Sequence, residues 1–205
     1  MVKTKKDTST EERILNAARK EFVANGLAGA RMQEIADKAG INKALLHYYF
    51  RSKEKLFEKV FIEAMSAFLP RINAIFNSEL ELLEKVKAFC SEYIDKITEN
   101  PFIPLFVMNE INKQPEEFVK NMWGSTKPNM KKLLLQIEDA VEKKQIRPIH
   151  PAHLMMNVIG MCIFPFIGKP IVQMVMNVSE KQFAQLMQER KTLIPEFVWQ
   201  SIKVK

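Results

Sequence analysis

Histidine, cysteine and glycine are scarce in this chain. Its 205 residues include three histidines, two cysteines and six glycines. The sequence contains no glycine-rich phosphate loop, no nucleophile elbow and no histidine–glutamate zinc motif. Three histidines also leave little material for a histidine-based active site. We therefore expect no enzymatic activity, no resident metal and no cofactor.

Long apolar runs are missing as well. The N-terminus is polar and has no apolar segment after its lysines, unlike a secretory signal. The most apolar stretch, 154–167, is interrupted by Asn157 and Pro165 and is too short to span a bilayer. We interpret Cys90 and Cys162 as reduced, buried thiols rather than a redox-sensing pair. These features predict a cytoplasmic protein with no membrane partner.

Helical periodicity runs through the whole chain, and no strand pattern, internal repeat or low-complexity tract is present. The hydrophobic content of 47% is enough for a real core. We therefore expect an all-α fold. Pro70 should interrupt or kink the fourth helix, 168–170 should form a turn, and Ser179 with Gln182 resembles a capping box. The expected helices cover about 11–25, 32–39, 43–49, 53–69, 80–98, a short segment opened by Pro115, 128–144, 151–164 and 180–203.

The segment 33–53, QEIADKAGINKALLHYYFRSK, has the pattern of a helix-turn-helix. Gly40 stands where the first helix should stop, because glycine accepts a left-handed backbone. Asn42 can cap the next helix. Leu45, Leu46 and Tyr49 are spaced to hold that helix against the core. A helical hairpin that binds nothing is the less favoured interpretation, since it does not need this residue order.

Positive charge is concentrated near this segment. Up to Val60 there are 13 lysines and arginines against 8 acidic residues, a net of +5. The remainder carries 18 against 16, a net of +2. A basic surplus in the helix-turn-helix region is the expected footprint of a polyanion partner.

The runs ILNAARKEF (14–22) and MQEIADKAGINKALLHYYFRSKEKLF (32–57) resemble the N-terminal domain of the TetR family of bacterial transcriptional regulators. The resemblance is dense from about residue 13 to 60 and fades beyond about 65. It implies a three-helix DNA-binding head, 1–52, joined to a helical ligand-binding and dimerisation body, 53–205. It also implies a regulator, by default a repressor, that binds double-stranded DNA.

This chain departs from the family pattern at four positions. The family usually has a hydroxyl residue at the positions of Ala30 and Arg31, where it caps the second helix and meets a phosphate. Arg31 can still reach a phosphate, but it cannot cap. The family often has threonine at the position of Leu45 and tyrosine at that of His47.

The expected DNA contacts lie on the second, third and fourth helices. Lys43 begins the third helix, where its ammonium can reach a guanine edge or a phosphate, and Gln33 can pair with adenine. Lys53 begins the fourth, where backbone amides and the helix dipole attract an anion. Two heads of a homodimer would read an inverted repeat at a spacing of ~34–36 Å. The full set is Arg31, Met32, Gln33, Asn42, Lys43, Ala44, His47, Tyr48, Tyr49 and Lys53.

The body is rich in methionine and phenylalanine, and unbranched methionine shapes adaptable apolar pockets. The resemblance implies a small-molecule site between body helices, for which we expect a largely hydrophobic ligand. For any single apolar residue, plain core is the commoner role, and a DNA-binding regulator without a ligand stays open as an alternative. The candidate ligand-binding residues are Tyr93, Phe106, Asn109, Trp123, Met130, Met156 and Asn157.

TetR-like proteins usually dimerise through two C-terminal helices, which here are the helices of 153–164 and 182–202. Part of their apolar surface should instead belong to the core of the same chain. The last helix, interrupted by Pro195, supplies Phe183, Leu186, Met187, Leu193, Ile194, Phe197 and Val198.

A metal-responsive regulator is a further alternative. His150 and His153 lie three residues apart, and Cys162 follows on the same expected helix. No carboxylate or second cysteine accompanies them. Capping or surface roles are therefore favoured.

Overall fold

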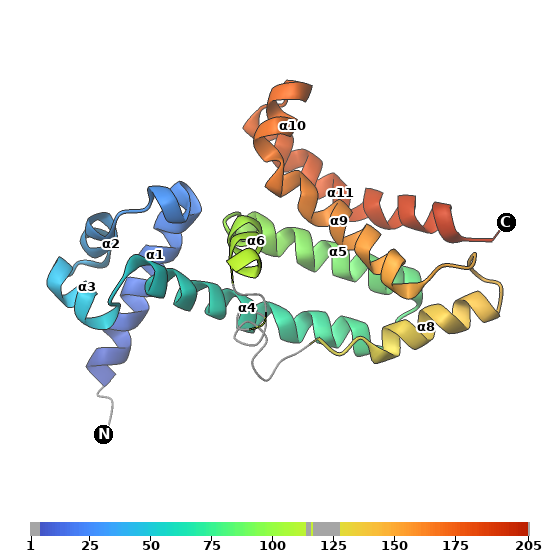
Figure 1. Cartoon of the computed structure of the whole chain (residues 1–205), viewed down its shortest axis with the longest axis horizontal. Coiled ribbons are helices and arrows are strands. Elements are labelled where there is room, and N and C mark those ends of the chain that lie inside the picture. Colours follow the sequence, from blue (N-terminus) through green and yellow to red (C-terminus); the bar gives the residue numbers. More distant parts are fainter. Residues whose placement is uncertain (1–4, 114–115, 117–127, 205) are drawn as a thin grey trace.

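The computed structural model describes residues 5–113, 116 and 128–204, and helices dominate these ranges (Figure 1). Within them no strand forms, although Ile146 and Lys203 make one isolated antiparallel bridge. The expected all-α fold is confirmed. The helices are α1 Lys5–Gly29, α2 Met32–Ala39, α3 Lys43–Tyr49, α4 Lys53–Asn77, α5 Leu82–Glu99, α6 Ile103–Lys113, α8 Lys131–Glu142, α9 Pro151–Ile167, α10 Lys169–Met176 and α11 Glu180–Ile202.

The helices form a small head and a larger body that share α4. The head consists of α1, α2 and α3, at the blue end of the chain in Figure 1. From the head α4 runs along the body, where it packs against α5 and α8. Helix α5 also packs against α9 and α11, which pack against each other. The α4 helix is therefore the continuous element between head and body.

Helix α4 does not stop near residue 69 as the sequence predicted, but continues through Pro70 to Asn77. Proline removes one backbone hydrogen bond and strains a helix interior. The turns beyond it are held by packing, because buried Phe76 stacks on Phe89 of α5 at 5.5 Å. The ammonium of buried Lys85 donates to the Phe76 carbonyl at 3.1 Å and so satisfies an acceptor at the helix end.

Two other helix boundaries differ from expectation. The sequence predicted a turn over 168–170, but α9 extends to Ile167 and α10 follows at once, bent by 73°. Pro170 lies in the first turn of α10, where its missing N–H breaks no helical bond. At the other end of the chain, α1 begins at Lys5 rather than near residue 11. The short helix expected from Pro115 lies outside the described residues.

Other local predictions agree with the structure. The capping box that opens α11 is confirmed, with the Gln182 N–H donating to Ser179 Oγ at 3.3 Å and the Ser179 N–H donating to Gln182 Oε1 at 2.9 Å. In the described ranges no single helix is both long and apolar enough to cross a bilayer. Only the bent pair α9 and α10 passes that length and composition test when the two are joined.

The two cysteines are buried and free, as expected, but they are not isolated from each other. Cys162 of α9 and Cys90 of α5 lie with their sulfur atoms 3.8 Å apart. The hydrogen bond to Cys90, together with burial, raises the pKa of the Cys162 thiol. Both sulfurs therefore pack as small apolar groups between two helices of the body.

Phenylalanines from three helices form a cluster where the head meets the body. The ring of Phe57 on α4 lies 4.7 Å from that of Phe22 on α1. On its other side it lies 5.1 Å from Phe102, which precedes α6, and 4.5 Å from Phe106 within α6. Phe22 and Phe57 are fully buried. We call these four residues the junction cluster, because head and body share it as one core.

Truncation of the central ring should destabilise the whole protein. Phe57→Ala should lower the free energy of unfolding by about 3–5 kcal/mol, from lost transfer energy and an unfilled cavity. The matched control is Ile62→Ala, on the partly exposed face of α4, which should change it by about 1 kcal/mol or less. Urea unfolding followed by circular dichroism measures both. Equal losses in the two variants would contradict a junction centred on Phe57.

Candidate nucleic-acid interface

The turn between α2 and α3 is fixed from both sides. Gly40 ends α2 with a left-handed backbone (φ 66°), as the sequence predicted. From α1, the Arg13 guanidinium donates to the carbonyl of Ala39 from Nε at 3.1 Å and to that of Gly40 from Nη2 at 3.1 Å. A Cβ on residue 40 would lie only 3.1 Å from Arg13 Nη2. Arg13 therefore locks the turn, a role that no sequence motif indicated.

Helix α3 is held by its cap and by one buried leucine. Asn42 Oδ1 accepts from the Leu45 N–H at 2.8 Å, as expected for an N-cap. Leu46 is fully buried, whereas Leu45 is 37% exposed. The prediction that Leu45 shares in holding the helix is therefore wrong. The reason is geometric, since a seven-residue helix turns only part of its surface to the core.

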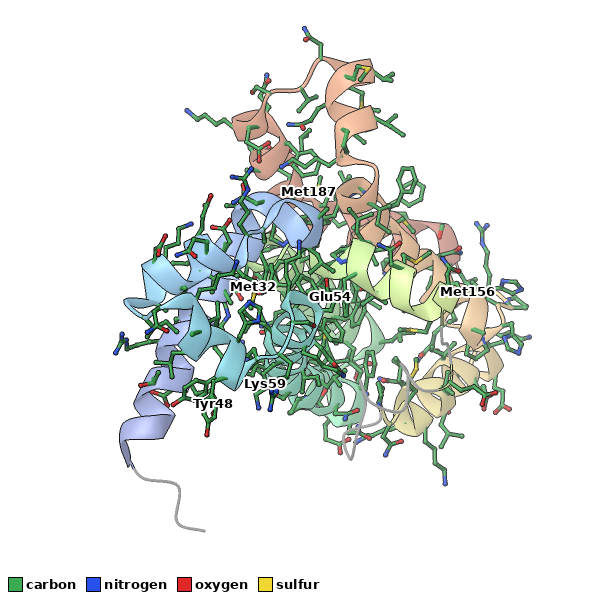
Figure 2. The ribbon with its side chains drawn as sticks, turned by 60° about the vertical axis from the view of Figure 1, so that its left-hand side comes forward. Met32, Tyr48, Glu54, Lys59, Met156 and Met187 are labelled. Atoms are coloured by element: carbon green, nitrogen blue, oxygen red, sulfur yellow. The ribbon has the colours of Figure 1, made fainter. Side chains whose placement is uncertain are left out.

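The other face of α3 is open to solvent. Lys43, Ala44 and His47 are exposed along it. Tyr48 is 75% exposed, and its side chain points away from the ribbon in Figure 2. Tyr49 is half-buried and meets the Tyr48 ring edge-on at 5.7 Å. The structure thus places these five predicted contact residues on one short helix.

The start of α2 is stabilised without the usual capping hydroxyl. Arg31 occupies the N-cap position and makes no side-chain cap, as expected. The buried carboxylate of Glu21 on α1 accepts from the backbone N–H of Arg31, from Asn25 Nδ2 at 2.6 Å and from the ammonium of Lys38. The Lys38 hydrogen bond is the main reason that the pKa of Glu21 lies below its ordinary value. Sequence reasoning missed Glu21, which has no local signature.

The remaining predicted contacts lie at the starts of α2 and α4. Met32 is half-buried, and the side-chain amide of Gln33 donates to Asp37 Oδ1 at 2.8 Å. Lys53 Nζ donates to the carbonyls of Ala28 at 3.3 Å and Ala30 at 3.1 Å. The Lys53 ammonium therefore ties the start of α4 to the segment that enters α2. Lys53 therefore orients the head relative to α4, and this role does not depend on whether it also binds an anion.

A cavity of about 630 Å³ lies in the body, between α4, α5, α6 and α9, and 128–130 completes its wall. Tyr93 and Met130 line it, whereas Phe106 packs in the junction cluster. Three other ligand candidates, Asn109, Met156 and Asn157, are exposed and are not part of the cavity wall; Figure 2 labels Met156. Trp123 lies outside the described residues.

Of the two neighbouring histidines, His150 caps a helix. His150 Nδ1 accepts from the Ala152 N–H at 3.2 Å and so caps α9. Its ring lies 6.1 Å from that of His153, while Cys162 is buried against Cys90. Over the described ranges, no group of three or more histidine, cysteine, aspartate or glutamate side chains is placed to hold a metal ion.

Known proteins resemble the chain in both sequence and fold. Residues 14–60 match the family described as "Bacterial regulatory proteins, tetR family". The HTH-type transcriptional regulator RutR of Escherichia coli (strain K12) is 28% identical over 148 residues, which are 72% of this chain and 69% of that protein. The biofilm operon negative regulator IcaR of Staphylococcus aureus (strain Newman) is 25% identical over 141 residues, 67% of this chain and 72% of the relative.

Solved structures share the fold over nearly the whole chain. A mutant HlyIIR protein superimposes with a TM-score of 0.62 at 22% identity, covering 97% of this chain and 99% of the other. The transcriptional regulator FadR from Bacillus subtilis, in complex with stearoyl-CoA, gives a TM-score of 0.63 at 16% identity, covering 93% and 98%. Both likenesses extend through head and body, including α4.

Loss of the α3 cap should weaken the head measurably. Asn42→Ala should lower the free energy of unfolding by about 0.5–2 kcal/mol, because the Leu45 N–H loses its acceptor. Asn42→Asp is the matched control, since aspartate caps as well as asparagine. Chemical denaturation of the two variants beside the unaltered protein gives the comparison. A loss in Asn42→Asp as large as that in Asn42→Ala would refute the capping role.

Proposed function

Because the chain belongs to the TetR family of bacterial transcriptional regulators, we propose that it is a homodimeric repressor. In this proposal it reads an inverted-repeat operator and leaves the DNA when a small molecule fills the body cavity. The observation that carries the proposal is the open face of α3. Its other face is anchored by Leu46, by the Asn42 cap and by the locked turn.

The exposed side chains suit a major groove and its flanking phosphates. Lys43 at the start of α3 can donate to a guanine edge, and Gln33 can present its amide to adenine once Asp37 releases it. The Tyr48 hydroxyl can donate to a phosphate, and Arg31 at the start of α2 can pair with another. Lys43 and Tyr48 project from a helix that the Asn42 cap and buried Leu46 already hold in place. Binding through α3 therefore needs little reordering of this helix.

The dimer interface in this proposal lies on α9, α10 and α11. Four of the seven apolar residues expected on α11 are buried in the chain's own core, namely Phe183, Met187, Ile194 and Val198. The other three remain exposed, and Phe197 is 65% exposed. Exposed apolar residues on α9 and α10 extend this surface, which is unusually apolar for a monomer. They are Phe164, Ile171, Met174, Val175 and Met176.

Signal transfer in this proposal passes through α4 and α6. Both helices line the cavity, α4 from Met65 to Phe76 and α6 through Ile103 and Val107. Both also enter the junction cluster, through Phe57 and Phe106. A ligand that moves α6 against α4 therefore pushes directly on the core of the head. Helix α4 would then shift Lys53 and the segment entering α2, in the manner of a packed helix switch.

A regulator that acts without a ligand is the second candidate. A body filled by its own side chains would favour it. The cavity of about 630 Å³ instead falls in the size range of small-molecule sites, about 300–1,000 Å³. For a metal-responsive regulator, the capping role of His150 is the observation that weighs against it.

Replacement of Lys43 should weaken DNA binding and alter its sequence preference. Lys43→Ala should cost about 1–3 kcal/mol on the preferred duplex, as expected for loss of a specific base contact. Lys143→Ala is the matched control, since this exposed lysine lies at the far end of α8. Fluorescence anisotropy on the gene's own upstream DNA, with random duplex as competitor, measures the effect. Equal binding by both variants, or no preference over random duplex, would count against the proposal.

A charge on the exposed face of α11 should separate the subunits. Phe197→Asp should give a monomer at micromolar concentration, because an unpaired carboxylate would be buried in the interface. Leu135→Asp, at an exposed position on α8, should leave the dimer intact. Sedimentation equilibrium distinguishes the two states. If both variants are dimers, the interface does not include Phe197. If the unaltered protein is a monomer, the proposed dimer does not exist.

A further inference from the structure

The body cavity has one polar end. Its described lining comprises apolar side chains with two exceptions, Tyr93 and Lys96, both on α5. Three residues apart on a helix, their side chains emerge on the same face. No aspartate or glutamate belongs to that lining. A ligand therefore meets hydrogen-bond donors at one place and apolar surface elsewhere.

The Tyr93 hydroxyl is a donor without a partner in the described part of the chain. Its ring is fixed between Phe68 of α4 at 5.7 Å and Phe89 of α5 at 5.3 Å. A phenol is protonated at neutral pH, and burial raises the pKa of Tyr93 further. Tyr93 lines the cavity, so a ligand oxygen placed there can accept a hydrogen bond from this hydroxyl.

Lys96 is a mostly buried cation with weak compensation. Its side chain is 19% exposed, and its nearest carboxylate is that of Glu99 at 3.9 Å. Glu99 itself is 69% exposed, so solvent screens this pair. Burial is the main reason that the pKa of Lys96 is lowered, and the nearby charges of Arg19 and Arg71 act in the same direction. An anion beside the ammonium would offset the cost of burying its charge.

The other acidic groups near Lys96 already have partners. A hollow of about 110 Å³ on the outer side shares Lys96 with the cavity and is also lined by Glu92, Asp95 and Glu99. Glu92 pairs with Arg71 of α4 at 3.4 Å, and Asp95 pairs with Lys191 of α11 at 2.5 Å. Lys96 thus stands where the cavity meets the surface. It is the cation best placed to receive the charged end of a ligand.

We propose that the ligand is an amphiphile of the long-chain carboxylate class, with its head group on Lys96 and Tyr93 and its chain in the apolar part of the cavity. This inference rests on the proposed function, in which the cavity is the effector site. The chain would lie along α4, against Met65, Leu69 and Ile72. A cationic amphiphile would be repelled by Lys96, and a purely apolar ligand would offer no acceptor to either Tyr93 or Lys96.

Three probes with the same chain and different head groups test the assignment. They are palmitate, hexadecanol and hexadecyltrimethylammonium, each used below its micelle-forming concentration. Isothermal titration calorimetry without DNA should show palmitate binding about 10- to 100-fold more tightly than hexadecanol, the worth of a hydrogen bond to a charged group. Equal or tighter binding of the alcohol or the cation, or no binding of palmitate, overturns the inference.

Variants assign the preference to Lys96. Lys96→Met keeps the apolar stem and should bind palmitate and hexadecanol alike, whereas Lys96→Arg should retain the carboxylate preference. Lys87→Met, which removes an exposed ammonium from the same helix, should behave as the unaltered protein. A carboxylate preference that survives in Lys96→Met would place the head group elsewhere and overturn the proposal. Tyr93→Phe should weaken palmitate binding several-fold, since it removes one neutral hydrogen bond.

A separate DNA-release measurement distinguishes this inference from the proposed function. Palmitate bound through Lys96 should lower the affinity of the protein for its upstream DNA. If it binds in this way and leaves the DNA affinity unchanged, the ligand class stands and the release mechanism fails. If instead an uncharged apolar compound releases the DNA and palmitate does not bind, the release mechanism stands and the ligand class fails.

Discussion

The packing of Phe57 against rings from the head and from α6 is the contact on which the rest of the structure depends. The head formed by α1, α2 and α3 has only a small core of its own, because small units bury a low fraction of their surface. Phe22 of α1 enlarges this core, because it packs in the same aromatic cluster as Phe102 and Phe106 of the body. The stability of α3 is therefore tied to the arrangement of α4 and α6. In the proposed function, this shared core is how a ligand in the body cavity would act on the head.

Sequence reasoning succeeded where the signal is local. The capped and glycine-terminated helices around Gly40 and Asn42 appear as predicted, and so does the capping box at Ser179. Each depends on residues within four positions of one another, so one sequence suffices to recognise it. Proline is the exception, because its local cost can be outweighed by distant contacts. Pro70 lies inside α4 because of packing such as that of Phe76 on α5. Pro170 lies in the first turn of α10, where the sequence predicted only a turn.

The candidate site was predictable only in part, for the same reason. The predicted contact residues on α3 follow from one helical face. In contrast, Arg13 reaches the turn before α3 across 27 positions, and Glu21 pairs with Lys38 of α2 across 17. Glu21 explains how the head tolerates Arg31 at a position where the family pattern would place a capping hydroxyl. The Glu21 carboxylate on α1 accepts a hydrogen bond from the backbone N–H of Arg31, and so helps to fix the start of α2. Lys96 was also missed, since an amphipathic helix gives no reason to place a lysine at a cavity.

A large cavity is costly for the protein that contains it, and this cost shapes how α4 can respond. Side chains such as Met65 and Ile163 face empty space and lose the dispersion contacts that a filled core would supply. A ligand that fills the space restores those contacts, yet it shifts the head only if it fits one arrangement of α4 and α6 better than the other. In the proposed binding mode, the polar end at Tyr93 and Lys96 would supply such a preference. It would fix one end of the ligand on α5, so that α4 and α6, the two helices that meet at Phe57, would accommodate the rest of its volume.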